Sequence, residues 1–287
     1  MTLRPRGGAE GGRGDVGVRA LFRPLFLWPD LIYNPTWAGK TGPLQYFKKM
    51  GITLNFKIQP QPTETTCGPS CLHAVYNFYG DHIALEEVTR EVKRLEEGGT
   101  LAVFLACHAL RRGYSARVYT YNLTVFDPTW FVRDGADISE RLSAQMREKD
   151  EPKLNTATKG YLEFLALGGE IRFEDLTTAL IRKYLNRSIP ILTGLSATYL
   201  YRSIREVGLT GADDDVRGEP AGHFVVFYGY DRLERSVLVA DPFEPNPVSG
   251  GHYYSINIDR ALCSILLGVL THDADFLIIR PKKERGI

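Results

Sequence analysis

Residues 61–80 read QPTETTCGPSCLHAVYNFYG, a polar run that changes into a helical pattern at Cys67. After this cysteine, apolar side chains recur at three- and four-residue spacing, and Gly80 supplies a stop signal for the helix. A thiol in the first turn of a helix lies among unpaired backbone N–H groups, at the positive end of the helix dipole. Both features favour the thiolate, which is the nucleophilic form of cysteine, so the pattern predicts Cys67 as a nucleophile.

A second segment, GHFVVFYGYDRLERSVLVADPFEP at 222–245, supplies a candidate base and a group to orient it. Two apolar runs separated by a polar turn predict a hairpin, in which the start of the first strand lies beside the end of the second. We therefore expect His223 and Asp241 to lie together at one end of the sheet. A carboxylate beside a histidine fixes the imidazole tautomer and stabilises the imidazolium. Gln61, six positions before Cys67, is a candidate side-chain donor to an oxyanion, beside the backbone N–H of Cys67.

The motifs Gln-x5-Cys-Gly-Pro-Ser-Cys-Leu, Gly-His-Phe-Val-Val and Val-Ala-Asp-Pro resemble those of the papain-like cysteine peptidases. The closest branch is the bacteriocin-processing (double-glycine leader) peptidase-like family, in its stand-alone form. The resemblance covers 56–80 and 188–242, with a looser match between them and to the end. It implies an α+β fold in which N-terminal helices bearing the nucleophile pack on a C-terminal antiparallel sheet.

The resemblance also implies a role for each candidate residue. Cys67 is the nucleophile, His223 the general base and acid, Asp241 the orienting residue and Gln61 the oxyanion donor. The chain order of these four residues agrees with that of the family. The implied chemistry requires no bound cofactor.

The sequence departs from the family pattern in three places. Thr66 precedes the nucleophile, where the family often has an acidic residue. The bacteriocin-processing enzymes are usually fused to a membrane transporter, and nothing in this sequence resembles one. The region 122–172 is longer than a minimal domain of this kind needs. These departures bear on the substrate more than on the chemistry.

Each candidate residue also has a purely structural interpretation. Cys67 is then an ordinary buried thiol, and His223 a histidine at the edge of a strand. Asp241 becomes a turn-former before a proline, and Gln61 a polar residue of a loop. The joint occurrence of the four residues in this order favours the catalytic interpretation.

A zinc site is a competing interpretation of the same region. Its ligands would be Cys67, Cys71 and His73, joined by Cys107 or His108. The sequence holds no CxxC pair, and helical spacing directs two of these side chains to different faces. We therefore predict no metal, and we expect Cys71, one turn after Cys67, to face the core.

The composition of the sequence limits the classes of partner and the cellular compartment that we expect for the protein. Lys and Arg number 35 against 34 Asp and Glu, which gives a net charge of +1 and argues against nucleic acid as a partner. The four cysteines form no disulfide framework, so we expect a reducing, cytoplasmic setting. The number of subunits stays open.

Three regions are expected along the chain. The first, 1–18, is an Arg- and Gly-rich disordered tail. The second, 19–50, is an arm that packs on the main domain or, alternatively, lies on a membrane surface; its apolar stretch is too short and too interrupted for a membrane span or a signal peptide. The third, 51–287, is the catalytic domain, with a charged insertion around 123–172 that is most simply solvated and is alternatively a substrate gate.

Periodicity places the elements of that domain. Helices are predicted at 67–79, 84–95, 101–112, 139–148, 161–167, 174–185 and 259–267, and strands at 117–121, 190–195, 224–230, 237–240, 252–258 and 276–279.

A run of three carboxylates, Asp213, Asp214 and Asp215, lies shortly before His223. Its simplest interpretation is a solvated turn. The functional alternative is an acidic substrate-binding lip that attracts a basic peptide or an amine. Calcium binding is disfavoured because the run lacks the alternating ligand pattern of a calcium loop.

Three classes of function are compatible with these residues. The first is thiol-dependent hydrolysis of a peptide or isopeptide bond, with a peptide or small amide as substrate. The second is acyl transfer or transpeptidation by the same triad, as in the phytochelatin synthases, which resemble this arrangement. The third is a catalytically silent peptide-binding module. The first two share their first half-reaction, so the sequence does not separate them.

Overall fold

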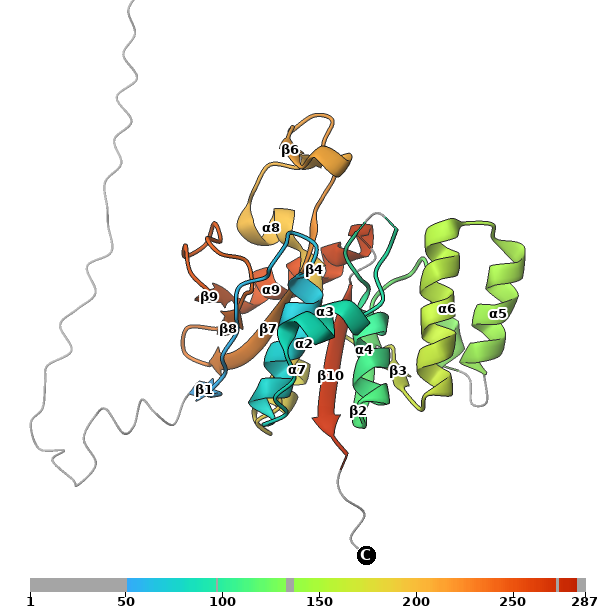
Figure 1. Ribbon diagram of the computed structural model, residues 1–287, viewed down its shortest axis with the longest axis horizontal. Helices are drawn as coiled ribbons and strands as arrows, with labels where there is room; N and C mark the ends of the chain where they lie inside the picture. Colours follow the sequence, from blue (N-terminus) through green and yellow to red (C-terminus); the bar gives the residue numbers. More distant parts are fainter. Residues whose placement is uncertain (1–50, 97, 133–136, 272–273, 283–287) are drawn as a thin grey trace, which may run out of the picture. The chain divides into compact units, whose positions relative to one another are not determined.

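The computed structural model of the protein describes residues 51–282 apart from 97, 133–136 and 272–273 (Figure 1). The predicted tail at 1–18 and arm at 19–50 lie outside the described residues. In the described part, no helix combines the length and the apolarity needed to cross a membrane.

A large sheet carries most of the strands. Their bounds are β1 (Gly51–Thr53), β2 (Tyr114–Thr120), β3 (Glu170–Arg172), β4 (Ile191–Ser196), β7 (Gly222–Asp231), β8 (Ser236–Ala240), β9 (Tyr253–Asn257) and β10 (Asp275–Pro281). The strand order is β3-β2-β10-β4-β7-β8-β9, with β1 paired to β7. Every pair is antiparallel except β2 with β3 at one edge. A separate small hairpin pairs β5 (Glu206–Val207) with β6 (Ala212–Asp213).

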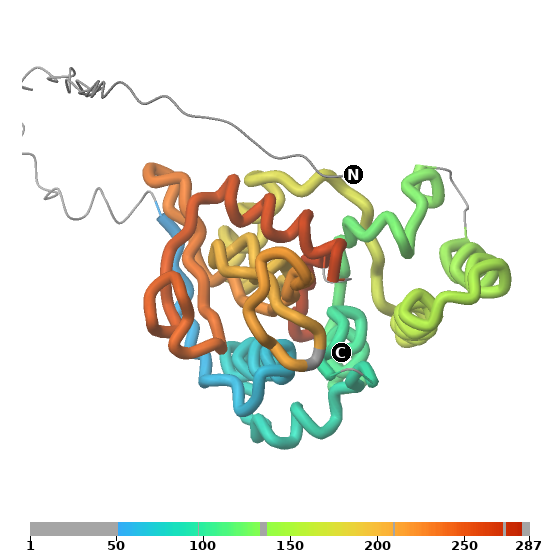
Figure 2. Tube along the Cα trace, turned by 90° about the horizontal axis from the view of Figure 1, so that it is seen from above, coloured from blue at the N-terminus to red at the C-terminus, as the bar shows by residue number. Residues whose placement is uncertain are grey.

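Helices cover both faces of this sheet. Their bounds are α2 (Cys67–Phe78), α3 (Leu85–Glu91), α4 (Ala102–Arg111), α5 (Ile138–Glu148), α6 (Pro152–Ala166), α7 (Thr178–Leu185), α8 (Ala197–Tyr201) and α9 (Ile258–Leu267). Helix α2 packs on β7 and α4 on β2, whereas α9 packs on β4 from the opposite face (Figures 1 and 2). The predicted α+β architecture, with the cysteine-bearing helix packed on an antiparallel sheet, is confirmed.

Helix α2 forms as its sequence predicts. Leu72, Val75 and Tyr76 are almost fully buried, and they anchor one face of the helix in the core. Gly80 ends the helix with φ +79°, a conformation that costs glycine little because it has no Cβ. The apolar face holds α2 against β7, and this fixes the position of Cys67 at its N-terminal end.

Helices α5 and α6, within the region 123–172, form a packed hairpin. Helices α5 and α6 pack on each other, and α6 packs on α4. Leu142 and Phe164 have no exposed surface. A Cβ added to Gly160 would lie 2.7 Å from a ring carbon of Phe104, so this glycine allows the close approach of α6 to α4. The helix predicted at 139–148 is confirmed as α5.

Element boundaries differ from the prediction where side chains cap or interrupt the pattern. Helix α7 begins at Thr178 rather than at 174, because the Thr177 hydroxyl accepts the Leu180 N–H at 3.1 Å and caps the helix. Helix α6 begins at Pro152, earlier than predicted, since proline is well suited to a first helical turn. The short strand β3 was not predicted; only three residues of it pair with β2.

Candidate active site

Cys67 is the first residue of α2, at the end of a tight loop. The Thr66 hydroxyl donates to the Thr63 carbonyl at 2.8 Å and accepts the Thr63 N–H at 3.0 Å. Thr66 is therefore used within the loop, and no side chain caps the N-terminus of α2. Backbone N–H groups of the first helical turn have no partner within the helix, so they are left facing the region of the thiol.

His223 lies at the start of β7, directly opposite Leu195 of β4. Its side chain is 7% exposed, whereas Cys67 is partly exposed. The thiol and the imidazole lie close enough for each to shift the pKa of the other. Because Nε2 of His223 is bonded to Asp241, Nδ1 is the nitrogen left for the sulfur.

Asp241 is completely buried just after β8, and it accepts four hydrogen bonds. Its Oδ1 accepts from Nε2 of His223 at 2.8 Å and from the backbone N–H of Phe243 at 2.9 Å. Its Oδ2 accepts from the hydroxyl of Tyr201 at 2.7 Å and from that of Tyr254 at 2.6 Å. Such complete satisfaction stabilises a buried carboxylate in its ionised form.

These contacts shift the ionisation of all three groups. Burial alone would raise the pKa of Cys67, but the charge and hydrogen bond of His223, with the backbone N–H groups of Phe224 and Gly68, hold that pKa below its ordinary value. Burial would lower the pKa of His223, yet the adjacent Asp241 and Cys67 raise that pKa to about 10. Burial would raise the pKa of Asp241, but His223 and the two tyrosines keep it low. Near neutral pH the site therefore favours a thiolate–imidazolium pair beside a carboxylate.

Two aromatic rings enclose the imidazole. The centroid of the His223 ring lies 6.0 Å from that of Tyr201 and 6.2 Å from that of Phe243. Both neighbours also contact Asp241, one through its hydroxyl and one through its backbone N–H. The rings thus hold the imidazole in place and limit the access of water to the His223–Asp241 hydrogen bond.

Gln61 lies in the loop that leads to α2. Its backbone N–H donates to the Pro242 carbonyl at 2.9 Å, which ties this loop to the residue after Asp241. Its side-chain Nε2 donates to the Thr63 carbonyl at 3.1 Å, and its Oε1 is buried without a partner. The side chain is directed into its own loop in this structure, so the oxyanion role stays a prediction.

The residues of the zinc interpretation have separate partners. Cys71 is completely buried, as expected, and its thiol donates to the Phe224 carbonyl at 3.2 Å. His73 contacts the Asn77 amide at 2.9 Å. The remaining candidate ligands also bond elsewhere: Cys107 to the Gly160 carbonyl, and His108 to Tyr76 and Glu91.

The three carboxylates at 213–215 do not act alike. Asp214 accepts the backbone N–H groups of Val216 and Arg217 and pairs with the Arg217 guanidinium at 2.6 Å, as the turn interpretation predicts. The backbone carbonyl of Asp215 accepts a hydrogen bond from Arg205. Asp213 lies in β6 opposite Glu206.

Glu206 connects this hairpin to the loop that precedes Cys67. Burial raises the pKa of Glu206, and the nearby charges of Asp213 and Glu64 raise it further. Glu206 thus lies near enough to both carboxylates for their charges to disfavour its ionised form. Asp213, rather than Asp214 or Asp215, is the member of the run whose charge acts on Glu206.

Sequence reasoning missed Tyr201, Tyr254 and Phe243. A tyrosine on a strand or a short helix carries no signal that its hydroxyl reaches a carboxylate elsewhere in the chain. Phe243 follows Asp241 by two residues, and its aromatic character was the only available hint.

A family model described as the Peptidase_C39 like family matches residues 53–260. No curated protein matches the sequence.

Solved structures with a similar fold include three bacterial examples. The peptidase domain of Streptococcus ComA, a bi-functional ABC transporter involved in a quorum sensing pathway, is 14% identical with a TM-score of 0.37; the match covers 79% of this chain and 99% of that one. A C39-like peptidase from Bacillus anthracis is 13% identical with a TM-score of 0.43, covering 81% and 99%. Xylellain, a cysteine protease from Xylella fastidiosa, is 14% identical with a TM-score of 0.39, covering 82% and 87%.

Proposed function

Because the chain belongs to the Peptidase_C39 like family and is a cysteine peptidase-like enzyme, we propose that Cys67, His223 and Asp241 form its catalytic triad. The observation that carries this proposal is the contact of His223 with both partners. Its Nε2 bonds to Oδ1 of the buried Asp241 at 2.8 Å, and the imidazole lies near enough to Cys67 for the thiol to raise the pKa of His223. A nucleophile beside a base that is bonded to an orienting carboxylate has the arrangement of a triad.

The reaction we propose is hydrolysis of a peptide or isopeptide bond. The Cys67 thiolate attacks the carbonyl carbon, and the electron pair of the C=O bond moves onto oxygen. His223, protonated in the resting pair, then gives its proton to the departing amine as the C–N bond breaks. A thioester remains on Cys67. Water, deprotonated by His223, attacks this thioester and releases the acid, which restores the thiolate and the imidazolium.

The charge that develops on the carbonyl oxygen needs donors nearby. The backbone N–H of Cys67, at the open N-terminus of α2, is one of them. We assign Gln61 as the second donor. For this role its amide must exchange the Thr63 carbonyl for the substrate oxygen, a rotation of a side chain whose backbone is already held by Pro242.

The acidic lip, in our proposal, selects substrates with a positive charge. Asp213 and Glu206 on the hairpin and Glu64 in the loop before the nucleophile supply the negative field. A basic peptide side chain or an amine placed among them would relieve the repulsion between the carboxylates.

Acyl transfer by the same triad is the alternative outcome of the second half-reaction, with an amine in place of water. The proposed compartment is the cytoplasm, because a catalytic thiol must stay reduced and a reducing compartment maintains it. A silent peptide-binding module is the remaining alternative; the lowered pKa of Cys67 argues against it, since binding alone does not need a thiolate.

A peptide-mixture assay tests the proposed reaction. The full chain is incubated with a degenerate peptide pool, and products are identified by mass spectrometry. We expect new termini with the wild type and with Cys263→Ala, an exposed thiol away from the site, and none with Cys67→Ala. Added hydroxylamine separates the two enzymatic alternatives, because an acyltransferase converts a large share of the product to the hydroxamate. Cleavage that survives Cys67→Ala would show that the triad is wrongly assigned.

A further inference from the structure

A cavity lies on the opposite face of the sheet from Cys67, between α8 and α9. Its volume is about 470 Å³, within the range of small-molecule sites. Its lining includes Tyr199 and Arg202 from α8 and its end, Arg260 and Cys263 from α9, and Leu267 and Leu270 beyond them. The alternation along β4 explains its place. Leu195 pairs with His223, and the next residue, Ser196, faces the other side and lines the cavity.

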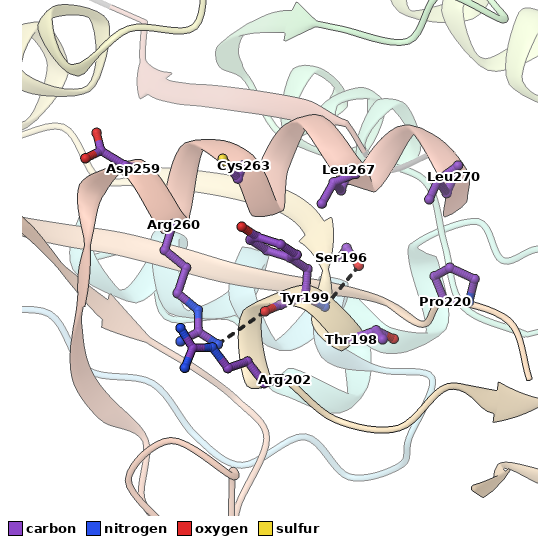
Figure 3. Close-up of a pocket in the computed structure, with 10 residues that line it drawn as sticks. All are labelled: Ser196, Thr198, Tyr199, Arg202, Pro220, Asp259, Arg260, Cys263, Leu267 and Leu270. Atoms are coloured by element: carbon purple, nitrogen blue, oxygen red, sulfur yellow. Dashed lines mark hydrogen bonds between the residues drawn. The ribbon is translucent and has the colours of Figure 1, made fainter. Parts of the chain in front are cut away.

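Two guanidinium groups lie together at one end of this cavity. Figure 3 shows the side chain of Arg260 reaching down from α9 to that of Arg202. Arg260 donates to the carbonyls of Tyr199, at 3.2 Å, and Leu200, but its Nε is buried and has no partner. Burial lowers the pKa of Arg260, and the positive charge of Arg202 lowers it further.

No carboxylate neutralises this pair among the residues that the structure describes. Neither Arg202 nor Arg260 forms an ion pair there. Asp259, the acidic residue of the lining, pairs instead with Arg235 at 3.2 Å. The two adjacent guanidinium groups repel each other, and an anion placed between them would offset that repulsion. The anion could also accept a hydrogen bond from the unpaired Nε of Arg260.

The other end of the cavity is apolar. Leu267, Leu270 and Pro220 lie there, away from the guanidinium groups (Figure 3). Leu270 is 62% exposed and Leu267 36%, which is unusual for leucines that line a concavity. Covering them would remove apolar surface from water, and this favours binding of an apolar group.

From this arrangement we propose that the cavity binds a small molecule with a carboxylate head and an apolar body. The carboxylate lies between Arg202 and Arg260, where the planar guanidinium fork matches its two oxygens. The apolar body extends along Leu267 and Leu270. This site is separate from the proposed peptidase reaction, and its occupancy does not depend on Cys67.

Binding of octanoate to the full chain tests the proposal. Titration calorimetry measures affinity, and alkylation of Cys263, which lines the cavity with an exposed side chain, reports occupancy at that place. We expect octanoate to bind and to slow Cys263 alkylation while leaving the rate at Cys67 unchanged. Acetate has the head without the body, and octylammonium has the body with the opposite charge; both should bind weakly or not at all.

Two matched pairs of variants assign the two halves of the ligand. Arg202→Gln should weaken octanoate binding about fivefold, as expected for a partly exposed ion pair, whereas Arg232→Gln in the β7–β8 turn should not. Leu270→Ser should also weaken it, in contrast to Leu233→Ser, an exposed leucine in the same turn. Equal affinity for octanoate and octylammonium, or an Arg202→Gln affinity equal to that of the wild type, would overturn the proposal. So would octanoate binding that leaves Cys263 alkylation unchanged.

Discussion

The hydroxyl of Tyr254 donates a hydrogen bond of 2.6 Å to Oδ2 of Asp241, on the side of the carboxylate that does not face His223. Tyr201 donates to the same oxygen from α8. The orienting carboxylate is therefore itself oriented, by two tyrosine hydroxyls. Positioning of this kind raises the proton affinity of His223 by keeping Asp241 ionised and fixed.

We predict that Tyr254→Phe or Tyr201→Phe lowers kcat about tenfold with little change in KM, because a hydrogen bond to a charged group contributes about 1.5–3 kcal/mol. With one donor lost, the pKa of Asp241 rises, that of His223 falls, and that of Cys67 returns toward its ordinary value. The pH at which Cys67 becomes reactive should then move upward. Tyr199→Phe, on the same helix as Tyr201, serves as the control; a loss of kcat without the pH shift would indicate only a structural role.

The pH dependence of Cys67 alkylation by iodoacetamide follows from the lowered thiol pKa. A group whose pKa is depressed ionises at lower pH, so alkylation should begin at a lower pH than for a free thiol, whose pKa is about 8.5. It should stay nearly constant until His223 loses its proton near pH 10. In His223→Gln the burial of Cys67 remains without the compensating charge, and the reactive range should move above that of a free thiol. If the pH dependence of alkylation is the same in this variant as in the wild type, Cys67 and His223 do not form an ion pair.

The Gln61→Ala variant tests whether the Gln61 side chain donates to the oxyanion or serves only to hold its loop. Loss of one oxyanion donor reduces kcat about 10²–10³-fold in enzymes of this type. Alkylation of Cys67 forms no oxyanion, so its rate should be unchanged. A variant with nearly normal kcat and a lower melting temperature would show that the side chain serves only to bond Thr63.

Gly68→Ala should disturb the nucleophile through its packing. A Cβ at this position would lie 2.7 Å from Cγ2 of Thr100, so the helix start must shift at a cost of about 1–3 kcal/mol. We expect lower stability to urea and slower alkylation of Cys67. Thr100→Ser removes the clashing methyl but keeps the hydroxyl that donates to Lys93, so the double variant should recover part of both. Gly251→Ala, which meets no neighbour, should have little effect.

The acidic lip predicts a charge effect on specificity. Asp213→Asn combined with Glu206→Gln should raise KM for peptides with Lys or Arg several-fold and reduce the effect of salt on that KM. Asp214→Asn should leave KM unchanged and loosen the turn, because its partner is Arg217. If cationic and neutral peptides respond equally to the double substitution, the carboxylates are merely solvated.

The sequence was sufficient to bring His223 and Asp241 together because hairpin geometry is local. The pairing of β7 with β8 follows from the apolar runs and the turn between them. The register also shifts between Phe227 and Gly229, which the sequence did not predict. The position of Cys67 was equally local, since it depends on a helix boundary with clear signals. Cys67 then comes near these two residues because the apolar face of α2 packs on the sheet.

The tyrosines were not predictable on the same grounds. Tyr254 reaches Asp241 because β9 pairs with β8 in one particular register, and Tyr201 because a short helix turns back over the end of β4. Neither of these two contacts produces a periodic pattern of residues that could be recognised in the sequence. The acidic run at 213–215 stays a prediction as a substrate-binding lip. Its three identical side chains occupy three different local environments, which charge alone does not distinguish.

The hydrogen bond from the Gln61 N–H to the Pro242 carbonyl joins two main-chain segments, one entering the nucleophile helix and one leaving the orienting aspartate. Both of its atoms belong to the backbone, so no side-chain replacement deletes it except a proline at 61. The spacing between these two segments thus depends on the fold of the main chain, and most single substitutions do not change it. Substitutions that change substrate specificity, in evolution or in a laboratory library, are therefore expected in the surrounding loops. The spacing between the two segments should stay constant.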